Sequence, residues 1–517
     1  MPTRRLLALL CLLGAALAAC SGGGEAVDVG GESGASDGAG AGEPAAGGTL
    51  VAAIAGSPDQ LDPHLTNAYF SFQILENVYD TLVEPDLELQ MQPALAESWE
   101  TSDDQLTWTF TLREGVTFHD GSELTADDVV SSMERIKEEG ANAFRLESVE
   151  SVTAVDDRTV EFSLSRPTPN LLANLGAFKG MAILPEGAAE DLDLASEANG
   201  TGPFRLASYS EVEGATLEAN PDHWDGAPAV DRVEFRFVSE PTAALTALQT
   251  GEVDWTDNVP PQQVSALEGE EGVTLDTVPS NDYWYFAANQ QREPFDDPRV
   301  RQALAFGIDR EEVTQAAKFD AATVNQTAIP ETSAWYLDYA PYEHDPQRAQ
   351  QLLQAAGASD LTLELMVTDE YPETVQAAQV MESQLAEIGV TVEIRTLDFA
   401  AWLDAQAQGD FDVFLLGWLG NIDPDDFYYA QHHSEGAFNY QGYASPEVDE
   451  LLDSARSETD PDVRKDLYDQ AVTRIVDDAS YVYLYNPDVV HAWGPDVDGY
   501  EVRPDRAIRF RDVELSR

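Results

Sequence analysis

The residues best suited to contact a ligand follow the most apolar stretch of the chain. Residues 411–416 form an uninterrupted apolar run, which is typical of a strand buried on both faces. Trp418, Asn421 and Asp423 come directly after it. Because ligands of α/β proteins bind where the strands end, we expect these three residues beside a cleft. Asp423 precedes Pro424, so its carboxylate either contacts the ligand or caps a helix.

A second candidate is the aromatic run Tyr283-Trp284-Tyr285-Phe286, which has the character of a strand. Alternate side chains of a strand face opposite sides. Tyr283 with Tyr285, or Trp284 alone, is therefore a candidate to stack on a ligand. The alternative is that these rings are buried in the core. We take Tyr283 and Trp284 as candidate binding residues.

Residue patterns of the common enzyme classes are missing from the sequence. His432 and His433 are neighbours and point about 100° apart in a helix, so they do not readily share a metal ion. The G-x-S-x-G match at 34–38 lacks the strand and helix that flank a catalytic serine. These observations favour a binding protein without metal or cofactor over an enzyme. A secreted hydrolase is the alternative, and it requires two carboxylates about 5–10 Å apart across the cleft.

Strands and helices alternate in the part of the chain that must position these residues. The pattern predicts a strand at 361–367, a helix at 373–388 and a strand at 390–394. This order implies parallel strands with helices on the faces of the sheet, and two such α/β lobes would meet at a cleft. Further helices are expected to begin at the Asp-Pro or Ser-Pro pairs 297–298, 345–346, 445–446 and 460–461.

Composition limits the partners and the compartment. The 517 residues include 95 Asp and Glu against 28 Lys and Arg, a formal charge of −67. Such a charge repels phosphate backbones, which argues against nucleic acid as a partner. The acidity suits a surface that works in high salt, or reflects ordinary acidic drift. The length is sufficient for about three folding units with large cores.

The N-terminus predicts export and a lipid anchor. Arg4 and Arg5 precede a 14-residue apolar run at 6–19, which is too short to span a membrane but fits a signal peptide. The following Cys20 stands where a bacterial lipoprotein signal has its lipidated cysteine; an ordinary cleavage site is the alternative. We therefore expect a signal peptide at 1–19. The lipidated Cys20 and a flexible Gly- and Ala-rich tether at 20–47 would hold the protein on the extracytoplasmic face of the cell membrane.

A series of motifs in order along the chain resembles the peptide/nickel/opine class of extracytoplasmic solute-binding proteins of ABC importers, family 5. The resemblance covers essentially all of 48–517. The motifs are Gly47-Gly-Thr-Leu-Val51, Leu61-Asp-Pro-His64, Leu75-Glu-Asn-Val-Tyr-Asp-Thr-Leu-Val-Glu-Pro85, Leu95-Ala-Glu-Ser-Trp99, Leu112-Arg-Glu-Gly-Val-Thr-Phe-His-Asp-Gly121, Thr125-Ala-Asp-Asp-Val-Val130, Gly200-Thr-Gly-Pro-Phe-Arg205, Asn220-Pro-Asp-His-Trp224, Pro294-Phe-Asp-Asp-Pro-Arg-Val-Arg-Gln-Ala-Leu304, Gly417-Trp418 and Asp423-Pro-Asp425.

The resemblance implies an α/β fold of the periplasmic-binding-protein type (type II, cluster C), with two lobes and an inserted third subdomain. It implies no catalysis: a monomer captures a solute between its lobes and delivers it to the permease subunits of an ABC importer. Oligopeptides are the favoured solutes, and oligosaccharides or other neutral solutes are the alternative. The implied division is lobe I at 48–84, 200–280 and 488–517, the inserted subdomain at 85–199, and lobe II at 281–487.

The resemblance also bears on the ligand contacts. In dipeptide- and oligopeptide-binding members, an Asp three residues after the Trp holds the α-ammonium of the ligand, and here that position is Asn421. Dipeptide binders also carry an Arg near the start of the helix predicted at 373–388, yet the chain has no Arg or Lys from 349 to 394. Both anchors of a dipeptide are therefore in doubt. Tyr69 and Asn439 are further candidates by their position in the family.

Overall fold

The computed structural model describes residues 47–178, 180–319, 321–419 and 422–517. Cys20, the expected signal peptide, the tether up to residue 46 and Asn421 lie outside the described residues. Within the described part of the chain, no helix is both long and apolar enough to cross a membrane.

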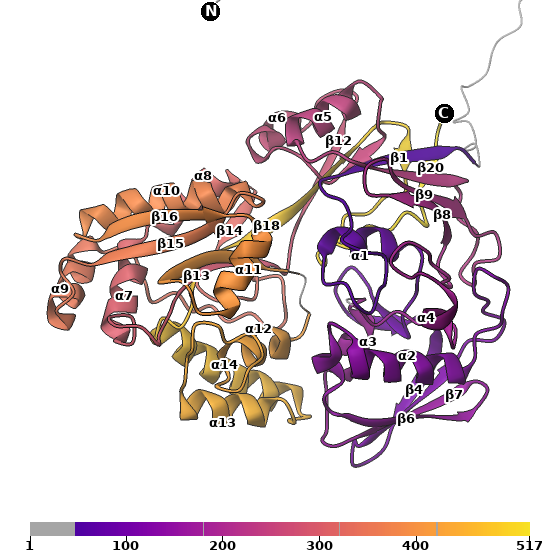
Figure 1. The fold of residues 1–517 in the computed structure, drawn as a ribbon, viewed down its shortest axis with the longest axis horizontal. Helices are drawn as coiled ribbons and strands as arrows, with labels where there is room; N and C mark the ends of the chain where they lie inside the picture. The colour runs from indigo at the N-terminus through magenta and orange to yellow at the C-terminus, as the bar shows by residue number, and fades with distance from the viewer. Residues whose placement is uncertain (1–46, 179, 320, 420–421) are drawn as a thin grey trace, which may run out of the picture. The chain divides into compact units, whose positions relative to one another are not determined.

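One extended sheet runs through the described residues in the order β16-β15-β17-β13-β18-β11-β1-β10-β9-β8, with β12 and β14 also paired to β18 (Figure 1). Its strands are β1 (Thr49–Ile54), β8 (Phe204–Ser210), β9 (Gly214–Ala219), β10 (Arg232–Phe237), β11 (Trp255–Thr256), β12 (Thr274–Pro279), β13 (Tyr283–Ala288), β14 (Ala322–Val324), β15 (Thr362–Thr368), β16 (Thr391–Leu397), β17 (Val413–Trp418) and β18 (Val482–Trp493).

Two lobes share this sheet, and each has its own hydrophobic core. In lobe II, the core residues lie between Tyr283 and Tyr485. In lobe I, the core combines residues from Leu50 to Tyr79, from Phe178 to Trp255 and from Val489 to Leu515. The C-terminal part of the chain thus returns to lobe I, where it also forms the small pair β19 (Val497–Asp498) and β20 (Glu514–Leu515).

Lobe II has the predicted strand–helix–strand order. Strands β15 and β16 are parallel and are joined by α10 (Pro372–Glu387), and β17 is parallel to β15. The predicted helix starts are confirmed, since Asp297, Asp345, Ser445 and Asp460 each accept a hydrogen bond from a backbone N–H of the helix that follows. The other helices are α7 (Pro298–Gly307), α8 (Arg310–Lys318), α9 (Pro346–Ala356), α11 (Phe399–Ala407), α12 (Pro424–His432), α13 (Pro446–Ala455) and α14 (Pro461–Asp477).

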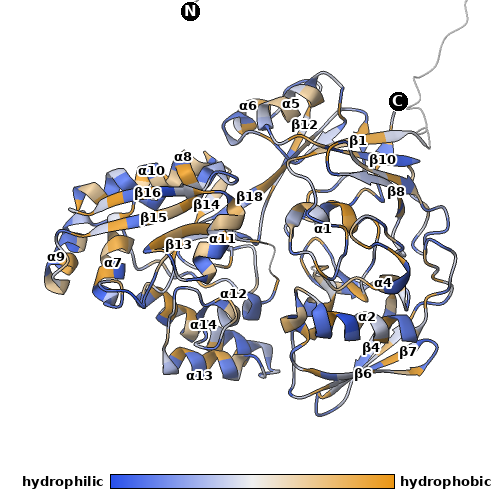
Figure 2. Ribbon diagram, in the orientation of Figure 1, coloured by the Kyte–Doolittle hydropathy of each residue, from blue (hydrophilic) through white to orange (hydrophobic). Residues whose placement is uncertain are grey.

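A third core lies between Leu82 and Ile183 and belongs to the inserted subdomain. Its antiparallel sheet has the order β4-β5-β7-β6, with β4 (Ala96–Thr101), β5 (Thr107–Leu112), β6 (Val149–Asp156) and β7 (Thr159–Leu164). The remaining elements here are β2 (Val83–Pro85), β3 (Met91–Pro93), α2 (Ala126–Glu139), η1 (Ala143–Leu146), α3 (Leu171–Gly176) and α4 (Ala188–Asp191). Hydrophobic and hydrophilic colours alternate along α2 and α13, as expected for helices with one buried face (Figure 2).

Lobe I is completed by α1 (Tyr69–Leu75), α5 (Pro241–Gln249), η2 (Pro261–Gln263) and α6 (Val264–Leu267). The chain passes from lobe I to lobe II between β12 and β13, and it returns within β18. The first half of β18 pairs with β13 and β14, whereas residues from Asp488 onward pair with β12 and β11. Ser280 Oγ donates to the Pro487 carbonyl at 2.6 Å and so joins the two crossings.

Asn486 also joins the two places where the chain passes between the lobes, and it is 4% exposed. Its Nδ2 donates to the carbonyls of Asp282 and Ala328 at 2.7 and 2.8 Å, and its Oδ1 accepts from Asn325 Nδ2 at 2.8 Å. A hydrogen bond lost here leaves buried backbone carbonyls without a donor.

We expect Asn486→Ala to lower the free energy of unfolding by about 2–4 kcal/mol, because two buried carbonyls lose their donor. Urea unfolding followed by tryptophan fluorescence measures the change. The control is Gln408→Ala at an exposed position, which should cost less than about 0.5 kcal/mol. Equal stability of the two variants would show that Asn486 does not join the crossings.

Candidate functional site

Two neighbouring cavities lie where lobe I and the inserted subdomain face lobe II. The larger, which we name the hinge cavity, has a volume of about 410 Å³, within the range typical of small-molecule sites. It is lined by Leu87, Glu88, Leu89, Gln90, Met91, Pro169, Asn170, Leu172, Ala173, Pro279, Asn281, Ile329, Pro330, Thr332, Ser333, Ala334, Trp335, Ile422, Asp423, Phe427 and Pro504.

The second cavity, which we name the arginine cavity, has a volume of about 40 Å³. Tyr69, Gln73, Arg506 and Arg509 from lobe I line it together with Leu419 and other residues. Ile422 lines both cavities, and Pro504 of the hinge cavity is followed in sequence by two residues of the arginine cavity. A ligand in one cavity therefore lies next to the other.

Asn281 gives the hinge cavity an unusual polar group. Its side chain is 4% exposed, and neither the amide oxygen nor the amide nitrogen has a hydrogen-bond partner among the described residues. Its backbone N–H donates to the Pro504 carbonyl, which fixes the residue at the crossing between the lobes. An amide that is buried without partners costs free energy unless something else satisfies it.

Of the predicted aromatic residues, Tyr283 and Trp284 are both buried in lobe II. Tyr283 is fully buried, and its hydroxyl donates to Gln431 Oε1. Trp284 is 4% exposed and covers Gly417, where an added Cβ would lie 2.2 Å from the indole ring. Both residues thus belong to the core of lobe II, as the core alternative states, and Trp284 packs against Gly417 of β17. Neither residue lines the two cavities.

Trp418 and Tyr69 lie at the faces between the lobes. Trp418 is half-buried at the end of β17, and its ring packs 4.9 Å from that of Phe438. Phe438 in turn meets Phe144 of the inserted subdomain edge to face at 5.5 Å. Tyr69 lies in the arginine cavity, with its hydroxyl donating to the Arg506 carbonyl at 3.2 Å.

Asp423 and Asn439 have structural partners. The Asp423 carboxylate accepts from the backbone N–H of Asp425 and forms a bidentate ion pair with Arg464 at 2.6 and 2.7 Å. Both side chains of this pair are at most 8% exposed. Asn439 donates to the carbonyls of His433 and Tyr443 and accepts from the Tyr443 N–H, which shapes the loop after α12. The geometry favours the capping alternative for Asp423.

Further ion pairs join the inserted subdomain to lobe II. Arg145 binds Asp426 at 3.1 Å, and both side chains are buried. Arg456 binds Glu147 of the inserted subdomain at 3.2 Å and Asp425 at 3.1 Å. Burial raises the pKa of the Asp425 carboxyl to about 6, although the Arg456 guanidinium opposes this shift. The inserted subdomain and lobe II are therefore joined by ion pairs, and that of Arg145 with Asp426 lies in a low-dielectric environment.

The paired histidines are part of the core of lobe II. His432 is fully buried between the hydroxyls of Ser480 and Tyr483, each 3.0 Å from a ring nitrogen. Burial lowers the pKa of His432 to about 3, so the ring is neutral. Among the described residues, no group of three or more His, Cys, Asp or Glu side chains is placed to hold a metal ion.

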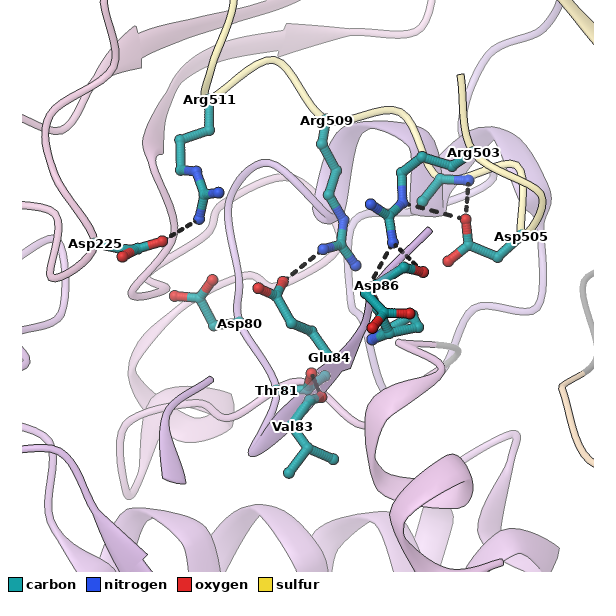
Figure 3. A network of polar contacts seen from close by, with 12 residues as sticks. Asp80, Thr81, Val83, Glu84, Asp86, Asp225, Arg503, Asp505, Arg509 and Arg511 are labelled. Carbon is teal, nitrogen blue, oxygen red and sulfur yellow. Dashed lines mark hydrogen bonds and ion pairs between the residues drawn. The ribbon is translucent and has the colours of Figure 1, made fainter. Parts of the chain in front are cut away.

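An arginine-rich segment at the C-terminus escaped the sequence reasoning. Arg503, Arg506, Arg509 and Arg511 lie within nine residues of a chain that has only 28 Lys and Arg, and this density was the signal that could have found them. Arg509 binds Glu84 at 2.5 Å, Arg511 binds Asp225, and Arg503 donates to the Pro85 and Asp86 carbonyls (Figure 3). These contacts fasten the C-terminal segment to the start of the inserted subdomain. Asn281, Arg464 and Trp335 were also missed, and no local pattern marks them.

We expect Asp423→Asn to lower the free energy of unfolding by about 3–5 kcal/mol, because it leaves Arg464 buried without a counter-charge. Chemical unfolding measures the change. The double variant Asp423→Asn with Arg464→Met removes both charges and should recover most of the loss. A single variant within about 1 kcal/mol of the original protein would show that the carboxylate is not committed to Arg464.

The raised pKa of Asp425 predicts a pH trend. Its ordinary pKa is about 3.9, so between that value and about 6 the folded protein binds a proton more readily than the unfolded chain. The contribution of Asp425 to stability is therefore lost as the pH rises through this window. We expect Asp425→Asn to gain stability relative to the original protein between pH 4.5 and pH 7, measured by urea unfolding. For the exposed control Gln408→Ala, which removes no titratable group, the difference should not change with pH. If the stability of Asp425→Asn relative to the original protein rose as the pH was lowered, this would contradict the burial of the Asp425 carboxyl.

Comparison with known proteins places this geometry in a family. Residues 90–439 match the model of the bacterial extracellular solute-binding proteins, family 5 Middle. The dipeptide-binding protein of Escherichia coli (strain K12) is 29% identical over 507 residues, covering 90% of this chain and 94% of that protein. The glutathione-binding protein GsiB of the same strain is 27% identical over 483 residues, with the same coverage.

Solved structures agree with this assignment. The periplasmic binding protein DppA from Helicobacter pylori, in complex with the peptide STSA, superposes with a TM-score of 0.82 at 29% identity, covering 91% of this chain and 98% of that chain. The oligopeptide-binding protein AppA from Bacillus subtilis, in complex with a nonapeptide, has a TM-score of 0.82 at 26% identity, with 92% and 100% coverage. The predicted two-lobed α/β fold is confirmed. The chain belongs to family 5 of the bacterial extracellular solute-binding proteins.

Proposed function

We propose that the protein is the solute-binding component of an ABC importer and captures oligopeptides between its lobes for delivery to the permease. The observation that supports this proposal most is the hinge cavity. It is lined by residues of both lobes, and the side-chain amide of Asn281 in its lining has no hydrogen-bond partner among the described residues. A peptide bond offers one N–H donor and one carbonyl acceptor, which match the free oxygen and nitrogen of this amide. The peptide ligands named for DppA and AppA support the same class.

Closure around the ligand follows from the lining. Asn170 and Met91 come from the inserted subdomain, whereas Trp335 and Phe427 come from lobe II. A ligand that contacts both sides gains those contacts only when the lobes are together, so binding favours the closed arrangement. The domain boundaries that accompany this proposal are 84/85, 199/200, 280/281 and 487/488. The core of lobe II, from Tyr283 to Tyr485, supports the last two. The first two do not coincide with the cores, because the core of lobe I includes residues from Phe178 to Leu194 and the core of the inserted subdomain begins at Leu82.

The lining carries little that would support hydrolysis. Of the described residues around the hinge cavity, only Glu88 and Asp423 have carboxylates, and Asp423 is bound by Arg464. No Lys, Arg or His is among these lining residues, which keeps neutral oligosaccharides as the second candidate. We further propose a monomer on the extracytoplasmic face of the membrane, in the periplasmic space where an outer membrane exists, exported by the signal peptide and anchored at Cys20.

Binding of peptide and oligosaccharide mixtures tests this proposal. We expect native mass spectrometry to show protein with an intact di- to pentapeptide bound, and calorimetry to give no binding of malto- or cello-oligosaccharides. Recovery of the peptide unchanged after incubation separates a binding protein from a hydrolase. Cleaved peptide, or binding of sugars alone, would overturn the proposed function.

Asn281→Leu adds a test of the cavity itself. We expect peptide affinity to fall by about tenfold, because one hydrogen-bonding amide is lost. The stability of the free protein should remain or rise, since the replaced amide has no partner. The matched control, Asn199→Leu, removes an amide that binds Asp120 outside both cavities and should leave affinity unchanged. Unchanged affinity in Asn281→Leu would place the peptide elsewhere.

A further inference from the structure

Arg506 differs from the other arginines of its segment. Arg503, Arg509 and Arg511 point to acidic residues or carbonyls of lobe I and the inserted subdomain (Figure 3). Arg506 lines the arginine cavity between the lobes, as does Arg509, which is paired with Glu84; the side chain of Arg506 is 30% exposed. Its guanidinium carbon lies 4.5 Å above the ring of Tyr69. The side chain is therefore placed at the surface that a ligand would meet.

One edge of the Arg506 guanidinium has no hydrogen-bond acceptor among the described residues. Nη1 donates to Asp282 Oδ2 at 3.0 Å, while Nε and Nη2 have no acceptor among the described residues. Those two groups form the parallel fork that binds a carboxylate through two hydrogen bonds. The ion pair with Asp282, whose side chain is 1% exposed, holds the fork in one orientation. The arrangement resembles a preformed anion site.

The backbone at Arg506 is held in an uncommon conformation. Its φ is +63°, in the left-handed region that residues other than glycine seldom adopt. The hydroxyl of Tyr69 donates to the Arg506 carbonyl at 3.2 Å and supports this conformation. Such local strain persists where surrounding structure enforces it, and it gathers at functional sites.

The size of the arginine cavity fits a small anionic group. Its volume of about 40 Å³ provides room for about three waters, close to the size of one carboxylate. The adjoining hinge cavity, about ten times larger, has room for the rest of a ligand. The ligand would thus place one charged end at Arg506 and its body beside Asn281.

The amino end of a peptide lacks a comparable partner in the lining of the hinge cavity, and the carboxylates that line the arginine cavity, Glu76 and Asp505, share that cavity with Arg506 and Arg509. Asp423 is bound on both oxygens by Arg464, and residue 421 is Asn. Glu88, the other carboxylate of the hinge-cavity lining, is exposed to solvent, where an ion pair contributes little. Asp257 lies near Arg506, but its Oδ2 accepts from Gln73 and the residue does not line either cavity.

We propose that Arg506 binds the C-terminal carboxylate of the ligand, so that the protein selects short peptides with a free carboxylate and tolerates a blocked amino end. This inference rests on the proposed peptide-binding function and assigns the charged anchor to the C-terminal segment of lobe I. Asn281 then forms hydrogen bonds with the backbone of the peptide, and the amino end of the peptide needs no buried counter-charge.

The test uses one mixture of tripeptides whose side chains are uncharged. The mixture is prepared in three forms, with free termini, with an amidated C-terminus and with an acetylated N-terminus, and the binding of each form to the full-length protein is measured by calorimetry. We expect amidation to weaken binding by about 10- to 100-fold, because the bidentate charged contact is lost. N-acetylation should change affinity by less than about threefold, because the two carboxylates that line the hinge cavity are either bound by Arg464 or exposed to solvent. Loss of binding on acetylation, or equal binding of acid and amide, would overturn the inference.

Variants locate the effect on Arg506. In Arg506→Gln the free and amidated tripeptides should bind alike, and in Arg506→Lys, which keeps the charge without the fork, discrimination should fall in between. Arg511→Gln is the matched control, since it removes a guanidinium of the same segment that lines neither cavity, and it should keep full discrimination. Discrimination that persists in Arg506→Gln would place the carboxylate elsewhere.

The outcomes separate the two proposals. Tripeptides that bind in every form without discrimination overturn the role of Arg506 and leave the proposed function standing. Absence of binding by any peptide form overturns both. Thermal unfolding of each variant checks that it is folded, and the comparison of acid with amide in the original protein needs no variant.

Discussion

The fold depends on one continuous strand that belongs to both lobes. β18 is hydrogen-bonded to β13 and β14 in lobe II and to β11 and β12 in lobe I. Because the backbone groups of a strand buried between neighbours need their partners, neither lobe can slide along β18 without breaking its ladder. The chain passes between the lobes at 280–282 and 486–488. The side chains of Ser280 and Asn486 hold these two crossings together, and the hinge cavity lies beside them, since Pro279 and Asn281 line it.

Buried charge pairs then fix the start of α12. Asp423, Asp425 and Asp426 occur at the start of α12, and each binds a different arginine, from lobe II or from the inserted subdomain. Desolvation offsets much of the attraction in such pairs, so they add little stability over an apolar contact. Removal of one partner alone is costly, however, and this cost ties the position of α12 to that of the inserted subdomain. Three adjacent carboxylates thus determine geometry more than they bind solute.

The sequence pattern predicted the helices and strands well because the interactions that determine them involve residues close together in the chain. The Asp-Pro helix starts and the strand–helix–strand order around α10 follow from capping and from periodicity, and both depend on neighbouring residues only. The site could be predicted only in part. Asp423 had two possible roles until Arg464, 41 residues away, was seen to bind it. Tyr283 and Trp284 are equally aromatic in sequence, and both pack in the core of lobe II because β13 lies between β17 and β18. Asn281 and Arg506 come together only through the crossing of the lobes, which no sequence pattern near either residue expresses.

The net charge gives the placement of Arg506 a further consequence. A chain with 95 acidic and 28 basic residues creates a negative field that disfavours anions at long range. Screening shortens that field to about 8 Å at physiological ionic strength, so recognition of a carboxylate depends on charges within the cleft. Arginines near the cleft have an acidic partner at close range, as Arg464 has Asp423, Arg145 has Asp426 and Arg506 has Asp282, but Nε and Nη2 of Arg506 have no acceptor among the described residues. A guanidinium with an open edge therefore has a local influence out of proportion to its single charge. Specificity for a carboxylate, on this argument, comes from the geometry of one fork and not from the overall electrostatics of the protein.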